Sequence, residues 1–465
     1  MTETARRSTP PPPGRRPGRS AGQDRSGAGR FDPINLGLAA VNRLAGSPAL
    51  DRLRIRRRAE RAVFTLTRTG FTATTAASRA FVAVRKRSSP ARPPSSRGPG
   101  LFDLTPTDEQ RMLTDVVREF AAERVRPAAT AADAACRTPD EITATAAELG
   151  ISQIGVPDEL GGLAAERSAM TNVLVAEALA HGDLGIAVAC LAPGAVSGAL
   201  SLWGSADQQA QYLPSFVADA PPAAALAILE PRPAFDPALL RTRASAVPGG
   251  YTIDGVKSLV SLATQAELFV VGAHLDGHGP ALFLVESGSA GLSVESEPAM
   301  GLRAAGMGRL VLDGVHLPAG ALLAGDAPDD PYVACVRLSR LGWCALAVGT
   351  AQAVLDHVVP YVNDRVAFGE PISHRQAVAF TVADIAIELD GMRLVTYRAA
   401  ARAEQGLRHE RETALARHLC AEKGMFIGSS GVQLLGGHGY VKEHPVERWY
   451  RDLRAVGLME GVVLV

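Results

Sequence analysis

The 465 residues suffice for two to four domains with a large core, and 47% hydrophobic with 21% charged residues is the composition of a globular protein. A bilayer span needs roughly 18 uncharged apolar residues in a row, and we expect no such span. The five cysteines are scattered and none forms a C-x-x-C pair, which excludes a disulfide scaffold and a zinc module and favours the cytoplasm.

The net charge of zero conceals two parts of opposite charge. Residues 1–100 contain 21 of the 48 Lys and Arg residues but 5 of the 48 Asp and Glu residues, which leaves 27 basic and 43 acidic residues in the remainder. Within this basic arm, residues 1–30 are predicted to be disordered, residues 31–86 favour two or three short amphipathic helices, and residues 88–100 have the composition of a linker. We expect the arm to be solvated or to dock on an acidic surface. An anionic membrane or a nucleic acid is the less favoured alternative, because a basic run alone is weak evidence.

Residues 101–220 are predicted to form an N-terminal helical domain. Thr105–Asp108 has the composition of a helix start with Pro106 in the first helical position. Residues 168–181 and 206–219 continue the helical periodicity.

Strands are predicted next, in a small β domain over residues 221–325. The expected strands are ALAILE, GYTIDG, ELFVVGAH, ALFLVE and RLVLDGVHL, separated by Gly, Asp and Pro turns. Residues 326–465 return to helical periodicity and are predicted to form a C-terminal helical bundle, with helices over 331–362, 374–405 and 410–434. The fold class is therefore α+β and multidomain, in the order helices, strands, helices.

Three places in this order suit a bound ligand. Glu230–Asp236 is a turn that leaves an apolar strand, where a ligand could approach the backbone; the alternative is that Asp236 caps a helix over 237–242. Asn363–Pro371 lies at a helix end, where Arg365 suits a pyrophosphate or complements the helix dipole. Gln433–Tyr440 contains glycines that let backbone pass close to a ligand or that cap a helix.

The fourth place is Glu460, a lone carboxylate among apolar neighbours. Loss of solvent makes such a group a better proton acceptor, which suits a general base; the alternative is an exposed acid in a frayed segment. The ten histidines show no metal-ligand spacing, and the sequence has no P-loop, Rossmann, serine-hydrolase or zinc-protease motif. We therefore expect no metal site.

Taken together and in this order, these stretches resemble the acyl-CoA dehydrogenase family of flavoproteins over about residues 104–461. The matching stretches are GVPDELGG (155–162), LWGSADQQAQYLP (202–214), ILEPRPAFDPALLRTRA (228–244), GYTIDGVKSLVS (250–261), MGLRAAGMGRLVLDGVHLP (300–318), GTAQAVLDHVVPYVNDRVAFGEPISHRQAV (349–378), QLLGGHGYVKEHPVERWYRD (433–452) and LMEG (458–461). No single stretch is decisive, so their number, order and spacing carry the resemblance. It implies N-terminal helical, middle β and C-terminal four-helix domains, here preceded by the basic, partly disordered arm.

The resemblance also implies FAD as cofactor and the oxidation of an acyl-CoA, or of an acyl thioester on a carrier protein, to the trans-2-enoyl thioester. Glu460 falls on the family's base, which removes the α-proton while the β-hydride goes to flavin N5. Positions that fall on contacts with FAD are Ile228, Leu229, Val260, Ser261, Arg365, Phe368, Gln433, Gly437 and Val462. Positions that fall on contacts with the substrate are Phe235, Arg340 and Met459.

Partners follow from the same resemblance. Arg365, Phe368, Gln433 and Gly437 fall on contacts to the FAD of a neighbouring subunit, which implies a homodimer or a homotetramer. Electron-transfer flavoprotein or another electron acceptor is the expected redox partner.

Several positions depart from the family pattern. Leu229 stands where the family has Thr, Phe235 where it has Ser, Leu259 where a Trp flanks the flavin, and Val462 where a Thr contacts FAD; the final helix is expected to be truncated. Each lost neutral hydrogen bond costs about 0.5–1.5 kcal/mol, so we expect weaker FAD binding. The alternative function is therefore a catalytically weakened or inactive homologue that acts as a binding or regulatory subunit.

Overall fold

The computed structural model describes residues 104–162, 167–323 and 330–465, so the predictions for the basic arm lie outside the described residues. The first described part is helical. Its elements are α4 (Asp108–Phe120), the π-helical turn η1 (Ala121–Val125), α5 (Arg126–Ala135), α6 (Asp140–Glu148), the short 3₁₀ turns η2 (Ile151–Gln153) and η3 (Asp158–Leu160), α7 (Ala169–Gly182), α8 (Leu184–Trp203) and α9 (Ala206–Phe216).

Helix α4 begins one residue after Thr107, which is its N-cap. The Thr107 hydroxyl accepts from the backbone N–H of Gln110 (3.1 Å), and the Gln110 side chain accepts from the backbone N–H of Thr107 (3.0 Å). This reciprocal pair satisfies two backbone donors that the first turn leaves free. The prediction that Pro106 occupies the first helical position is therefore wrong, because the helix starts at Asp108.

The middle part is a seven-stranded sheet. Its strands are β1 (Ala224–Ala227), β2 (Arg243–Val247), β3 (Gly250–Val260), β4 (Leu268–Leu275), β5 (Gly279–Glu286), β6 (Leu292–Ser296) and β7 (Gly308–Pro318). They lie in the order β1-β4-β2-β3-β7-β6, with β5 also paired to β4. Strand β4 is apolar along nearly its whole length because both of its faces are buried. The sequence prediction missed β2 and β6, which are short and mostly exposed or half-buried.

The last part is again helical. It contains α10 (Pro331–Asp364), the hairpin strands β8 (Val366–Ala367) and β9 (Glu370–Pro371), the 3₁₀ turn η6 (Ile372–His374), α11 (Gln376–Glu404), α12 (Glu410–Leu435), α13 (Gly437–Tyr440), α14 (Val446–Leu453) and the 3₁₀ turn η7 (Arg454–Gly457). The three long helices agree with the prediction to within two residues at each end. The predicted order of helices, strands and helices is confirmed.

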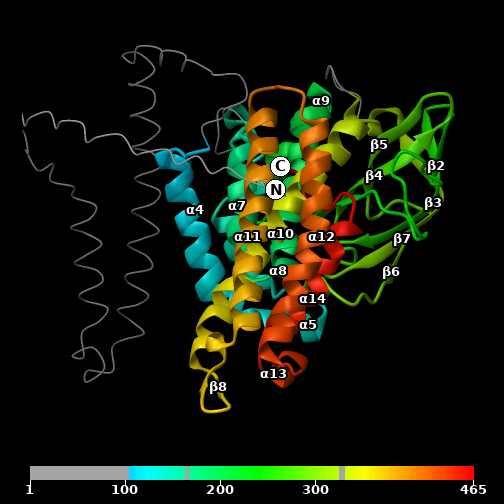
Figure 1. Cartoon of the computed structure of the whole chain (residues 1–465). Helices are drawn as coiled ribbons and strands as arrows, with labels where there is room; N and C mark the ends of the chain where they lie inside the picture. The colour runs from blue at the N-terminus through cyan, green and yellow to red at the C-terminus, as the bar shows by residue number, and fades with distance from the viewer. Residues whose placement is uncertain (1–103, 163–166, 324–329) are drawn as a thin grey trace, which may run out of the picture. The chain divides into compact units, whose positions relative to one another are not determined.

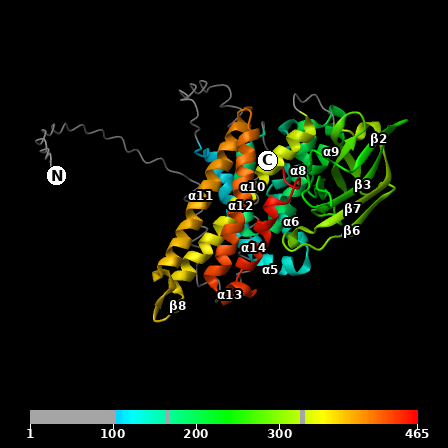
Figure 2. The same ribbon diagram turned by 45° about the vertical axis from the view of Figure 1, so that its right-hand side comes forward.

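Figures 1 and 2 show the sheet on one side of the long helices, with α10, α11 and α12 running side by side. Helix α10 also packs closely on α7, where a Cβ at Gly349 would come within 2.0 Å of the Glu177 carbonyl oxygen. Strand β1 and helix α8 pack against each other, so the end of β1 faces the helical core. This junction between strand and helices is where the site residues meet.

Among the residues that the structure describes, two helices have the length and composition of a membrane span. They are Leu184–Trp203, which contains no charged residue, and Pro331–Asp364. In the most apolar windows of these helices, 78% and 83% of the residues are buried inside the protein. Their apolar character is accounted for by the protein core that they form.

Candidate active site

Glu460 follows η7 and is held by arginines from two long helices. Arg340 of α10 donates to both carboxylate oxygens, from Nε at 3.0 and 2.9 Å and from Nη2 at 2.7 Å. The guanidinium of Arg417 on α12 lies 3.8 Å from the same carboxylate and donates to the Met459 carbonyl. The prediction of a lone carboxylate among apolar neighbours is therefore wrong: Glu460 is buried, but it is ion-paired.

The two arginines differ in how their surroundings affect them. Hydrogen bonding to Glu460 raises the pKa of Arg340 above its usual value, whereas burial lowers the pKa of Arg417. Both remain cations at any physiological pH. The carboxylate is thus fixed in orientation by a two-pronged contact on one side and by a second positive charge on the other.

The backbone after Glu460 makes a tight turn. The Gly461 carbonyl accepts from Ser339 Oγ (2.6 Å), from Trp343 Nε1 (2.9 Å) and from the backbone N–H of Val463 (3.1 Å). Val462 has φ +81, which is strained for a β-branched residue and is found here inside a three-residue turn. Ser339, Arg340 and Trp343 lie on one stretch of α10, so this helix holds both the carboxylate and the turn that presents it.

Residues from the β domain approach this turn directly. A Cβ at Gly461 would lie 2.8 Å from Ile228 Cγ1, so glycine is required for this contact. Leu229, next along the chain, accepts at its carbonyl from the N–H of Ser258 (2.9 Å), which ties the end of β1 to β3. The structure therefore brings together three segments that sequence analysis assigned to one site: 228–229, 259–261 and 459–462.

A buried ion pair supports the end of β1. Lys257 is fully buried, and its Nζ donates to the Ile228 carbonyl and to Glu230 Oε1, both at 3.1 Å. Burial lowers the pKa of Lys257 to about 8, although the Glu230 charge opposes this shift. Burial works to raise the pKa of Glu230, but Lys257 and the N–H groups of Thr242 and Arg241 together hold it below its usual value. The pair fixes the backbone of the strand exit rather than facing a ligand.

Ser261 carries the one polar side chain among the predicted FAD contacts at this junction. Its hydroxyl is fully buried and has no hydrogen-bond partner among the described residues. A buried hydroxyl without a partner costs about 1–3 kcal/mol, so a polar ligand atom would satisfy it. Leu259, two residues earlier, adopts φ +51 and is held by a hydrogen bond from its N–H to Glu297 (2.7 Å).

A second group of predicted residues lines one cavity at the far end of the bundle. Arg365, Gln433 and Gly437 border a space of about 340 Å³ together with Tyr361 and His438. Gly436 ends α12 with φ +56, which confirms the expected helix cap, and β8 and α13 lie at the same end of the bundle (Figure 1). A guanidinium beside glycine backbone is a suitable surround for a pyrophosphate.

Other predicted residues lie apart from both groups. Phe368 is 96% exposed at the turn of the β8–β9 hairpin, where the Arg375 guanidinium lies 5.8 Å from its ring. Phe235 is half-buried and lies 5.1 Å from the Arg232 guanidinium. Residues 237–242 form turns and bends, so the alternative of a helix capped by Asp236 is wrong; Asp236 instead accepts from the Ala238 N–H.

Sequence reasoning missed Ser339, Trp343 and Arg417. Trp343 follows Arg340 by three residues and Ser339 by four, and this spacing was the available signal, because residues three or four apart share a helix face. Arg417 gave no signal, since its approach to Glu460 depends on the packing of α12 against α10. The roles of the other site residues in ligand binding stay predictions.

Comparisons with known proteins agree with the order of the three domains. Family models described as the N-terminal, middle and C-terminal domains of acyl-CoA dehydrogenase match residues 107–219, 225–315 and 333–463. The short/branched chain specific acyl-CoA dehydrogenase of Bos taurus is 31% identical over 375 residues, which cover 79% of this chain and 86% of that protein.

Solved structures show the same relationship. Butyryl-CoA dehydrogenase from Megasphaera elsdenii aligns with a TM-score of 0.70 and 26% identity, over 76% of this chain and 95% of that one. A glutaryl-CoA dehydrogenase from Mycobacterium smegmatis, solved in complex with FADH2, aligns with a TM-score of 0.69 and 25% identity, over 76% of this chain and 90% of that one.

Proposed function

We propose that this chain, which belongs to the acyl-CoA dehydrogenase family, oxidises an acyl-CoA or acyl carrier-protein thioester to its trans-2-enoyl thioester. The family consists of FAD-dependent oxidoreductases that act on CH–CH groups and are typically homo-oligomers. We further propose a cytoplasmic location, which the five unpaired cysteines support. The observation that carries the proposed reaction is the buried Glu460 carboxylate, fixed at the junction of β1 with α10.

The residues present fit FAD at two points. Arg365, Gln433 and Gly437 converge on one cavity that suits a pyrophosphate, and the Ser261 hydroxyl is buried without a partner in the described chain. When bound, FAD supplies the acceptor for the β-hydride. The proposed role of Arg365 is a two-pronged contact with phosphate oxygens, and that of Ser261 is a hydrogen bond to a polar ring atom.

Glu460 is proposed to take the α-proton of the thioester at a carboxylate oxygen. Of its two oxygens, Oε1 accepts from Arg340 Nε and Nη2, whereas Oε2 accepts from Nε alone and so keeps a lone pair for the proton. The Gly461 carbonyl is held by Ser339 and Trp343, so the backbone beside the carboxylate keeps its place while the side chain reacts. Resemblance further assigns the Glu460 N–H to the thioester oxygen, where developing negative charge needs a donor.

A second candidate is the weakened or inactive homologue that acts as a binding or regulatory subunit. The observation that favours it is the same ion pair, since Arg340 and Arg417 lie beside the carboxylate, where a substrate would have to approach it. Leu229, which is apolar and buried where relatives carry a hydroxyl, points the same way.

Anaerobic titration of the FAD-loaded protein with a panel of acyl-CoA thioesters separates the two candidates. A dehydrogenase is expected to lose its visible flavin absorbance with at least one thioester, and Glu460→Gln is expected to abolish that loss by removing the base. Glu443→Gln, a matched change at an exposed carboxylate of the same domain, is expected to leave it unchanged. Bound flavin that no thioester reduces would favour the second candidate.

A further inference from the structure

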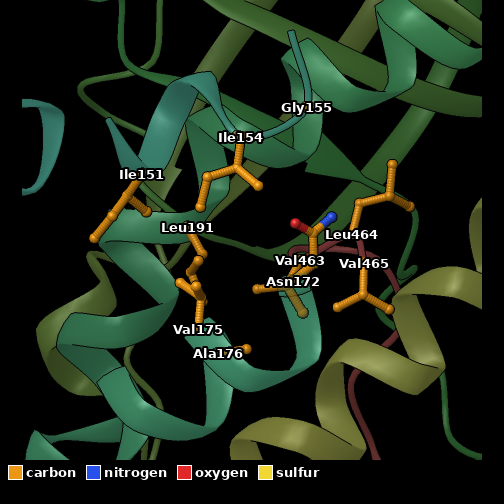
Figure 3. Close-up of a pocket in the computed structure, with 11 residues that line it drawn as sticks. Ile151, Ile154, Gly155, Asn172, Val175, Ala176, Leu191, Val463, Leu464 and Val465 are labelled. Atoms are coloured by element: carbon orange, nitrogen blue, oxygen red, sulfur yellow. The ribbon is translucent and has the colours of Figure 1, made fainter. Parts of the chain in front are cut away.

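Residues 463–465 fill apolar space between the helices directly after the catalytic segment. Val463 and Val465 are almost fully buried, and Leu464 packs against a second apolar cluster. Close packing leaves no slack: a Cβ at Gly342 on α10 would lie 2.8 Å from Val463 Cγ2, and one at Gly198 on α8 would lie 3.4 Å from Leu464 Cδ2. Figure 3 shows this segment running beside the helices that carry Val175 and Leu191.

A small cavity remains beside the segment. Its volume is about 30 Å³, and its walls are apolar side chains of α7 and α8, including Val175, Ala176 and Leu191, together with Val463–Val465. The only polar side chain that borders it belongs to Asn172, whose Oδ1 has no partner within the part of the chain described here. A cavity of this size has room for about one water molecule or one methyl group.

The small cavity lies near Glu460, so it is a candidate site for the acyl chain of the substrate. If Glu460 takes the α-proton, the rest of the acyl chain must extend from that carboxylate into apolar surroundings. Val463 lies three residues further along the chain, at most about 10 Å away, and it lines the small cavity together with residues of α7 and α8. Residues 463–465 already occupy most of the apolar space around this cavity.

We propose that Val463, Leu464 and Val465 set the acyl-chain length and restrict the substrate to short acyl thioesters, of about the size of butyryl-CoA. This inference rests on the proposed function and names its substrate class. The methylenes of a longer chain would find only the small cavity and would compete with side chains that the protein buries itself. Each methylene that does enter an apolar site strengthens binding about fourfold, at about 0.8 kcal/mol.

Calorimetric titration of the FAD-loaded protein with butyryl-, hexanoyl- and octanoyl-CoA tests this inference without requiring turnover. The wild-type protein is expected to bind octanoyl-CoA no more tightly than butyryl-CoA. Val463→Ala and Leu464→Ala enlarge the cavity, and each is expected to strengthen octanoyl-CoA binding at least fourfold relative to butyryl-CoA binding. Val358→Ala, the same loss at a buried position of α10 outside the cavity wall, is the matched control and is expected to change neither.

Leu464→Ala creates the larger void and is the variant more prone to unfold, so Val463→Ala decides the question if Leu464→Ala does not fold. Octanoyl-CoA binding by the wild-type protein that is 100-fold tighter than butyryl-CoA binding would overturn the inference. So would octanoyl-CoA binding that Val463→Ala leaves unchanged. If either of these two binding results is found and butyryl-CoA still reduces the flavin, the chain-length inference fails but the proposed function stands. If no acyl-CoA of any length binds, the proposed function fails with it.

Discussion

The ion pair between Arg340 and Glu460 is open to a quantitative test by a double-mutant cycle. The changes are Arg340→Gln, Glu460→Gln and the two together, all of which remove charge; Glu460→Gln also keeps the side-chain length. Breaking a fully buried pair by removing one partner costs about 3–5 kcal/mol, because the remaining charge is left without compensation. Here the Arg340 side chain is 34% exposed, so solvent reduces the cost of either change. Arg417, 3.8 Å from the carboxylate, reduces only the cost of Arg340→Gln, because Glu460→Gln leaves both arginines without their anion.

We therefore expect Glu460→Gln to lower the free energy of unfolding by about 2 kcal/mol and Arg340→Gln by about 1 kcal/mol. The double variant is expected to lose less than the sum of the two, because two glutamine amides can hydrogen-bond to each other. The coupling energy should be about 1–2 kcal/mol. Urea denaturation with an unchanged slope for all four proteins measures it. A coupling energy below about 0.5 kcal/mol would refute the two-pronged contact, since sites that do not interact are additive within that margin.

Two further predictions concern stability against pH and cofactor affinity. Asp452 is buried and accepts from the Leu302 N–H (2.6 Å), and burial together with the charge of Asp183 raises its pKa to about 7. The folded state therefore holds a proton that the unfolded state loses near pH 4, so wild-type stability should fall as pH rises from about 4 to 7. Asp452→Asn should remove that fall, so that its melting temperature exceeds that of the wild type at pH 8 but not at pH 4. Asp313→Asn, a change at an exposed position that leaves Asp452 in place, should show the same fall as the wild type. Parallel profiles for Asp452→Asn and wild type would contradict the assignment. Arg365→Lys should weaken FAD binding about tenfold in a flavin-fluorescence titration, since an ammonium group cannot make the two-pronged phosphate contact, whereas exposed Arg411→Lys should have no effect. Equal affinities for Arg365→Lys and wild type would place the pyrophosphate elsewhere.

Local patterns predicted the long helices well because their causes are local. The apolar periodicity of α10, α11 and α12 and the breaks between them fix the helix ends, which the prediction placed within two residues. Strands β2 and β6 were missed because their residues are only partly buried and show no clear alternation. β2 forms a strand by pairing with β3, and β6 by pairing with β7. The sequences of β2 and β6 alone do not predict these pairings.

The environment of Glu460 could not be predicted from its neighbours in the sequence. Leu458, Met459 and Val462 suggest an apolar surround, yet the nearest charged group comes from Arg340, 120 residues away. The resemblance assigned Arg340 to the substrate and gave no reason to expect it on the base. Likewise, the burial of residues 463–465 depends on glycines at positions 198 and 342, which open the groove that the segment fills.

The turn at Gly461 and Val462 connects the base with the segment proposed to set chain length. A β-branched residue at positive φ costs about 1–3 kcal/mol, and such strain persists only where the surroundings enforce it. On one side, Ser339 and Trp343 hold the Gly461 carbonyl; on the other, burial of Val463 contributes about 1.5–3 kcal/mol, comparable with the strain. Since both restraints act on the same turn, trimming Val463 removes part of what keeps Val462 strained. The chain-length segment therefore also helps to position the carboxylate, and a site that admits longer chains should hold its base less firmly.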